Sequence, residues 1–240
     1  LYLYCALGVK ATVADGALWV HTYSAGTTDL PSMTIEAMRG SDSKEQFLGC
    51  KVQTLEISGS AGEEVKMSAE IIAKTAGTRT GSATPSYGTG KQAYHYEVSS
   101  MDITPSGGSG TVNFILQNFT LTLNNAIDRK NELGSKLTGE PDITDFRSAE
   151  LSAEAFQEDN TLYNLQLSGT PYDIVIEMVQ TGTNNFIKLY LYNAVITEYD
   201  DNIDSVGRIS QSFTFMGFAD STNEAIKIEV RNSSSDAISN

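Results

Sequence analysis

The chain has 240 residues, of which 40% are hydrophobic and 19% are charged, and its formal net charge is −14. A chain of this length buries roughly 70 to 75% of its unfolded surface, so its core needs no metal or disulfide. The negative charge excludes a protein that grips nucleic acid, because such binding comes from Lys and Arg side chains that release counterions.

The same charge is compatible with a conduit through which DNA slides without sticking. No apolar run approaches the ~20 residues that cross a bilayer, and no basic segment precedes an apolar stretch as in a signal peptide. The polar residues are mainly Ser, Thr, Asn and Gly, which favours strands and turns over long surface helices.

The first clear element is a β-hairpin at residues 50–72. Apolar and polar residues alternate in 51–58, where Leu55 and Ile57 flank Glu56, and again in 65–71. A period of two predicts strands with one buried side, and the Gly-rich segment 59–64 predicts the turn. On the second strand we expect one set of side chains to face the core: Val65, Met67, Ala69 and Ile71.

A surface loop is expected at 75–93, which is rich in Gly, Ser and Thr and has no apolar rhythm. A short strand at 93–99 and a Gly-rich turn at 105–110 follow it.

A second hairpin combines strands at 117–124 and 147–156, both with a period of two. The connection between them, 125–146, is much longer than an ordinary hairpin loop, which predicts a functional arm that reaches a neighbour. The two hairpins have a similar organisation, and the sequence leaves open whether this is a structural duplication or an accident.

One helix is predicted within 157–171. Asp159 or Asn160 is the candidate N-cap, and Gly169 with Pro171 supplies the stop. Alternating strands follow at 172–179, 186–197, 208–219 and 226–231, and the polar tail 232–240 is expected to be loose. No break in composition divides the chain, so we expect a single domain over residues 1–240.

The cysteines and histidines indicate no reactive site. Cys5 and Cys50 are too few for a disulfide framework, and buried thiols are favoured, with a Cys5–Cys50 bridge as the alternative. His21 and His95 stand in strand-like segments without metal-ligand spacing, which favours partly exposed strand residues. No GxSxG elbow occurs to support Ser-His-Asp chemistry.

Two short motifs fail as ligand loops. In the segment 88–92 a phosphate loop would need glycine at Pro85 and Ser or Thr at Gln92. In the segment 200–204 acidic and amide residues have the spacing of half a calcium loop, but Ser205 replaces the required glycine. A solvated turn is favoured there, with an adventitious Ca²⁺ site as the alternative.

Glu150 and Glu154 have the spacing of a carboxylate pair on one strand face, as in glycosidases. Such pairs lie in clefts with aromatic platforms, whereas Trp19 is the only tryptophan. We therefore predict no catalytic residue, no cofactor site and no metal site.

Several motifs in this order resemble the tail tube (major tail) proteins of long-tailed bacteriophages. They are Leu30-Pro31-Ser32, Gly49-Cys50, Gly59 to Gly62, Asn124-Asn125 and Gly169-Thr170. The resemblance spans residues 28–220 and is most specific across the two hairpins. It implies a β-sandwich or barrel-like unit with one flanking helix. Six such units would form a ring, rings would stack into a tube, and the two hairpins would supply four lumen strands per subunit.

The polar faces of these hairpin strands then become lumen candidates. Six copies would form stacked acidic rings, which repel DNA phosphates and leave few places for DNA to pause. The expected lumen-facing residues are Glu56, Lys66, Ser68, Glu70, Thr120, Thr122, Glu150, Ser152 and Glu154.

The resemblance also implies partners. Subunits would contact each other head to tail around the ring, where inner-sheet edges pair into a closed barrel. Tape measure, tail terminator and tail tip or baseplate proteins would bind the tube in the virion, after assembly in the bacterial cytoplasm. The expected inter-subunit residues of the long connection are Asp128, Arg129, Lys130, Glu132, Glu140 and Asp142.

The main alternative is a binding module, such as a β-sandwich adhesin, a pilin-like subunit or a carbohydrate-binding domain. It would share the strands and the acidic surface. It would also need a concentrated aromatic patch, whereas the 11 tyrosines are scattered along several strands. An enzyme is the third interpretation.

Overall fold

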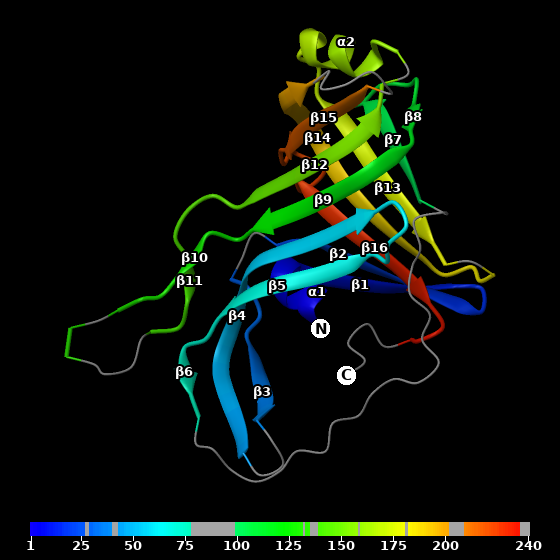
Figure 1. The fold of residues 1–240 in the computed structure, drawn as a ribbon. Coiled ribbons are helices and arrows are strands. Elements are labelled where there is room, and N and C mark those ends of the chain that lie inside the picture. Colours follow the sequence, from blue (N-terminus) through cyan, green and yellow to red (C-terminus); the bar gives the residue numbers. More distant parts are fainter. Residues whose placement is uncertain are drawn as a thin grey trace.

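The computed structural model describes residues 1–26, 29–39, 43–77, 99–131, 133–134, 139–157, 159–180, 182–201 and 209–235. Within them, fourteen strands form one continuous antiparallel sheet that folds over on itself into two layers (Figure 1). The described strands do not close into a barrel. The predicted mainly β, sandwich-like fold is confirmed.

The outer layer contains seven strands. Its order is β1-β2-β16-β14-β13-β7-β8. The bounds are β1 Gly8–Asp15, β2 Leu18–Ala25, β16 Ile226–Asn232, β14 Phe186–Asp200, β13 Tyr172–Val179, β7 Ser99–Pro105 and β8 Val112–Phe114.

The inner layer contains both predicted hairpins. Its order is β14-β15-β12-β9-β4-β5. The remaining bounds are β15 Ser210–Gly217, β12 Ser148–Phe156, β9 Leu116–Asn124, β4 Ser43–Ser60 and β5 Lys66–Ile72. Both hairpins are confirmed, since β4 pairs with β5 and β9 pairs with β12.

Strand β14 joins the two layers. Its residues 186–191 pair with β13 and β16, whereas its residues 195–200 pair with β15. Between these parts Asn193 adopts a φ of 47° and its backbone N–H donates to Asp173 Oδ1 at 3.0 Å. This left-handed residue bends the strand from one layer into the other.

The core fills the space between the layers because the strands alternate apolar and polar residues. Leu121 and Leu151 of the inner layer meet Ile174, Ile176 and Leu189 of the outer layer around one small void. All five side chains are buried. The apolar sides of the hairpins therefore face inward, as their period of two predicts.

Three further parts project from the sandwich (Figure 1). At the bottom, β3 (Met33–Arg39) and β6 (Thr75–Ala76) pair with the first half of β4, which turns at Gly49 with a φ of 60°. At the top lies α2 (Thr161–Ser168), the predicted helix, which ends at the left-handed Gly169. At the left, β10 (Ile127–Asp128) pairs with β11 (Asp142–Ile143).

The structure corrects four expectations. A second helix, α1 (Tyr2–Leu7), precedes β1. Met67 is 50% exposed rather than buried, because β5 is an edge strand that pairs only with β4. His21 is buried rather than partly exposed, and its Nε2 lies 3.0 Å from the Ser234 carbonyl oxygen. The first residues of the expected loose tail are therefore anchored.

Cys5 and Cys50 are free, buried thiols, which confirms the favoured interpretation. Burial raises the pKa of both thiols above the usual value. His95, most of the loop 75–93 and the segment 202–204 lie outside the described residues.

Candidate lumen surface

The nine predicted lumen residues lie together on the outward side of the inner layer, which we call the inner-sheet polar face. Cross-strand pairing arranges them in rows with neighbouring polar residues. The rows are Ser68-Glu56-Thr122-Glu150, Lys66-Ser58-Thr120-Ser152, Glu70-Thr54-Asn124-Ser148 and Ser60-Asn118-Glu154. The residues between them in each strand point into the core, as Leu55, Leu121 and Leu151 do.

Hydrogen bonds hold several of these side chains in place. Asn118 Nδ2 donates to Glu154 Oε2 at 2.8 Å, and the hydroxyls of Ser152 and Thr214 lie 3.2 Å apart. Lys66 Nζ lies 2.6 Å from Glu63 Oε2, a pair that raises the pKa of Lys66. Because Lys66 is paired locally with a turn carboxylate, it does little to offset the glutamates of the face.

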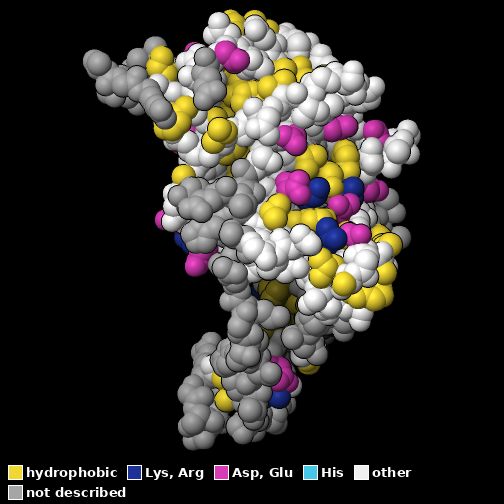
Figure 2. Space-filling model, turned by 90° about the vertical axis from the view of Figure 1, so that its right-hand side faces the viewer, with side chains coloured by type: hydrophobic (Ala, Val, Ile, Leu, Met, Phe, Trp, Pro, Cys, Tyr) yellow, Lys and Arg dark blue, Asp and Glu magenta, His cyan; other side chains and the backbone are white. Residues whose placement is uncertain are grey.

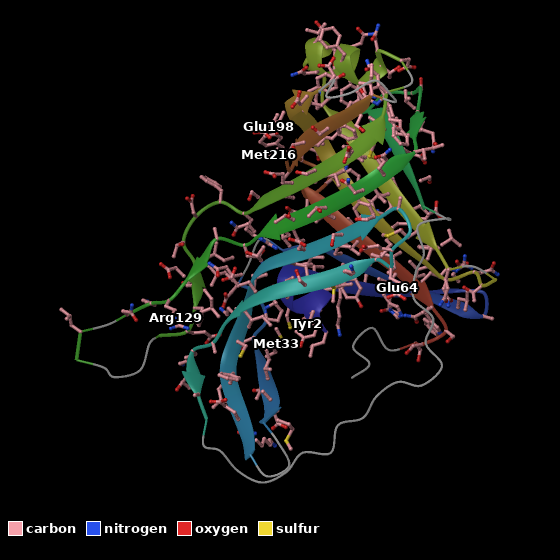
Figure 3. The ribbon with its side chains drawn as sticks, viewed as in Figure 1. Tyr2, Met33, Glu64, Arg129, Glu198 and Met216 are labelled. Atoms are coloured by element: carbon pink, nitrogen blue, oxygen red, sulfur yellow. The ribbon has the colours of Figure 1, made fainter. Side chains whose placement is uncertain are left out.

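The face extends beyond the two hairpins. Strand β15 pairs with β12 along eight residues and continues three of the rows with Ser212, Thr214 and Met216. The second half of β14 adds Glu198 and Asp200, which are opposite Thr214 and Ser212. Figure 3 labels Glu198 and Met216 on this side of the sandwich.

Sequence reasoning missed these two carboxylates, although Glu198 and Asp200 have the same spacing of two as the residues it found. The alternating pattern of these residues is visible in the sequence, but it does not show which strands they join. The pairing between β12 and β15 is non-local, and the resemblance implied only the two hairpins. With Glu154 they line a shallow hollow of about 360 Å³ on the face. The acidic character of the face is therefore stronger than expected.

Polar contacts stabilise the root of the long connection. The β10–β11 pair closes it, and Lys130 accepts a backbone hydrogen bond from Gly139 at 2.6 Å. Lys51, which is only 2% exposed, lies 2.6 Å from Asp29 Oδ1 and 3.5 Å from Glu140 Oε1. These contacts hold the two ends of the connection, which we call the root; the part of the connection between Lys130 and Gly139 is called the arm.

Of the six predicted inter-subunit residues, the structure places five on this arm or its root. Asp128, Arg129, Lys130, Glu140 and Asp142 are all exposed, and Glu132 lies outside the described residues. The carboxylates of Asp128 and Asp142 each accept the N–H of the following residue. Together these five side chains carry two positive and three negative charges.

The outward face of the outer layer differs in charge pattern. Its lysines and arginine pair with acids: Lys188 with Glu177, Lys227 with Glu229, and Arg231 with Asp15. On the side of the molecule that Figure 2 presents, basic and acidic side chains likewise lie close together. The basic side chains of this face are thus paired with acids, whereas Lys66 is the one basic residue among the nine predicted lumen residues.

Within the described ranges, no three His, Cys, Asp or Glu side chains are grouped as metal ligands. No helix among these residues is both long and apolar enough to span a membrane.

Comparison with known proteins gives a match to one family model and matches to 16 chains of solved structures. A chain of the anti-feeding prophage baseplate, solved by cryo-electron microscopy with 6-fold symmetry imposed, is 10% identical, with a TM-score of 0.42 over 61% of this chain and 96% of that chain. No curated protein matches by sequence. The family model described as phage tail tube protein matches residues 1–217. The chain therefore belongs to the phage tail tube protein family, whose members are structural components of the virion tail.

Proposed function

We propose that six copies of this chain form a ring, that rings stack into the tail tube, and that the inner-sheet polar face lines a lumen through which DNA passes. Tape measure protein would occupy this lumen before DNA, and tail terminator and tip or baseplate proteins would close its ends. The host cytoplasm would be the place of assembly.

The observation that carries the proposal is the division of the inner layer into two sides. One side is the core of the subunit, and the other gathers Glu56, Glu70, Glu150 and Glu154 in adjacent rows. A lumen wall needs this division, since it must be packed on one side and wet on the other. Fixed negative charge along the wet side repels phosphate and gives DNA no site at which to bind.

The edge of the inner layer supports a ring. Strand β5 is an edge strand, and Met67 on its core side is half exposed. An unpaired apolar edge invites pairing with another chain, and natural proteins seldom leave one uncovered. In a ring the opposite side of a neighbour's inner layer would cover it, which makes the contact head-to-tail and lets the ring close.

Electron microscopy of the purified protein tests this proposal. We expect rings or tubes of uniform width with an open centre. A gold-labelled maleimide on Thr120→Cys should then appear inside the tube, and on Thr22→Cys, which lies on the outer layer, it should appear outside; Cys5 and Cys50 are buried. Monomers only, or gold from Thr120→Cys on the outer wall, would contradict the proposal.

A further inference from the structure

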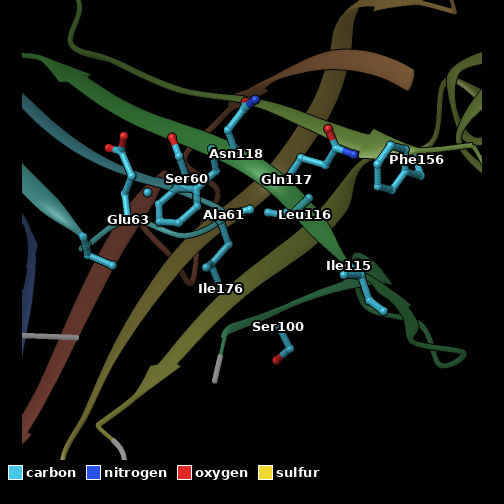
Figure 4. Close-up of a pocket in the computed structure, with 13 residues that line it drawn as sticks. Ser60, Ala61, Glu63, Ser100, Ile115, Leu116, Gln117, Asn118, Phe156 and Ile176 are labelled. Atoms are coloured by element: carbon cyan, nitrogen blue, oxygen red, sulfur yellow. The ribbon is translucent and has the colours of Figure 1, made fainter. Parts of the chain in front are cut away.

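An apolar groove opens at one end of the inner-layer strands (Figure 4). It has a volume of about 720 Å³ and lies where β4 and β12 end and where β9 begins. Phe119 of the inner layer and Ile176 of the outer layer line it, and so does Ile115, which is 79% exposed. An exposed apolar hollow of this size marks a place where another molecule binds.

Helix α2 carries an exposed apolar surface. Leu162 is buried and Leu165 is partly buried against the sandwich, whereas Tyr163 and Leu167 are 45% and 66% exposed. Because these two residues are four positions apart, they share one face of the helix. None of the eight residues of α2 is charged, so this face can enter an apolar groove without removing a charge from water.

Strand pairing places the groove and α2 at the same height of the inner layer. One row of paired residues crosses five strands and consists of Gly59, Phe119, Ala153, Phe213 and Tyr199. At one end of this row, Gly59 and Phe119 line the groove. At the other end, the ring centroid of Tyr199 lies 6.2 Å from that of Tyr163 in α2.

The helix does not fill the groove of its own subunit, since Leu167 and Ile115 are both exposed in the single chain. The row spans four strand spacings, or about 19 Å, between Gly59 and Tyr199. The groove extends through Val65 to the edge of the layer at β5, and α2 packs on the second half of β14 at the opposite edge. If these edges meet in a ring, α2 of one subunit lies beside the groove of the next.

We propose that α2 of each subunit docks into the groove of its neighbour in the same ring, with Tyr163 and Leu167 in the hollow and Ile115 covered by them. The inference rests on the proposed function and names a contact that orders the subunits around the ring. Helix and groove are different surfaces, so the contact is heterologous and closes on itself after one turn of the ring.

A protein with both Leu167→Cys and Ile115→Cys tests the contact. After assembly and oxidation, denaturing gels without reductant should show a ladder of covalent species that ends at the hexamer, because each subunit is linked to both neighbours. The native Cys5 and Cys50 are buried. Leu167→Cys with Val13→Cys is the matched control and should give no ladder, since Val13 is 64% exposed but lies on β1, at the opposite edge of the outer layer from β8.

The possible outcomes separate the contact from the proposed function. Rings or tubes that give no ladder, or the same ladder with Val13→Cys, would overturn the contact and leave the proposed function standing. A ladder that continues beyond six would mean that the helix links different rings, which would also overturn it. Wild-type protein that forms neither rings nor tubes in electron microscopy would overturn the proposed function itself.

Removing the apolar side chains provides a second test. Tyr163→Ser with Leu167→Ser should raise the protein concentration needed for ring formation by about tenfold, because two apolar side chains no longer fill the groove. Circular dichroism should be unchanged, since both side chains are exposed in the subunit. Asn164→Ser with Gln166→Ser, also exposed on α2, is the control and should assemble as the wild type does. An equal effect of the two pairs would overturn the contact.

Discussion

Arg147 joins three separate parts of the chain at the start of β12. Its Nε donates to Asn125 Oδ1 at 2.7 Å, its Nη1 to the Gly26 carbonyl at 2.8 Å and its Nη2 to the Ala6 carbonyl at 3.0 Å. Desolvation lowers the pKa of Arg147, yet a guanidinium remains charged at any ordinary pH. The residue thus fixes α1 and the end of β2 against the root of the arm.

Replacing Arg147 with Ala should lower the free energy of unfolding by about 2–4 kcal/mol, because three charge-assisted bonds are lost and the Gly26 carbonyl is left without this donor. Arg147→Lys should recover only part of the loss, since an ammonium cannot reproduce the planar fork. Urea denaturation followed by fluorescence would measure both. Arg129→Ala is the control and should change stability by less than about 0.5 kcal/mol. An equal effect of the two alanine substitutions would contradict the role assigned to Arg147.

Residues such as Arg147 and Asn125 could not be assigned these roles from the sequence. The resemblance marked Asn124-Asn125 as a motif, but the structure supplies the reason. The Asn125 amide is buried and donates to the carbonyls of both Ala6 and Val52. Such contacts join residues more than 70 positions apart, and no periodicity along the chain encodes them.

At the scale of elements, the sequence predicted the strands that have one apolar and one polar side, and it missed the strands and the helix that lack this pattern. The hairpin strands alternate cleanly because one side of each is wet, so their period of two was visible. In the segment 18–25 residues on both sides of the strand are at least partly buried, so its sequence alternates less clearly. The short apolar run of α1 fits a helix as well as a strand. The β10–β11 pair has only two residues per strand, too few for any pattern to emerge.

The root of the arm packs against the rest of the subunit, whereas Leu133, a described residue near the tip, is fully exposed. The Lys51–Glu140 ion pair and the buried Ile127 lie in the root. Removing Glu140 would leave Lys51 with Asp29 alone in a largely buried position. A deletion that tests the arm must therefore spare the root.

Replacing residues 131–138 with the dipeptide Asn-Gly should abolish tube formation without unfolding the subunit. The hydrogen bond between Lys130 and Gly139 already brings the two ends together, so a tight two-residue turn can join them. Circular dichroism and thermal unfolding would report the fold, and electron microscopy would report assembly. As a control, the same dipeptide can replace residues 106–109 in the turn between β7 and β8. Normal tubes from the arm deletion would contradict the arm's role in assembly.

At the scale of the whole molecule, pairing beyond the hairpins decides the width of the candidate lumen wall. The resemblance implied four strands per subunit, whereas β15 and the second half of β14 enlarge the same face. The acidic excess itself follows from composition, because a net charge of −14 must be carried by exposed side chains.

Reversing charge on this face should turn a non-binding lumen into a binding one. Glu56 and Glu150 flank Thr122 in one row of the face. Tubes of the Glu56→Lys, Glu150→Lys variant should retain short linear duplex DNA in co-sedimentation, and the retention should fall steeply with added salt, because Lys side chains would release counterions from the phosphates.

Two control experiments distinguish DNA retained inside the tube from DNA bound to its outer wall. Closed circular DNA cannot thread a tube, so it should not be retained by the same variant, and Glu56→Gln with Glu150→Gln should retain neither form. Asp102→Lys, on the outward face of the outer layer, should not favour linear over circular DNA, because both reach the outside equally. If the lumen variant retained both forms alike, its lysines would lie on the outer wall and the inner-sheet polar face would not line the lumen.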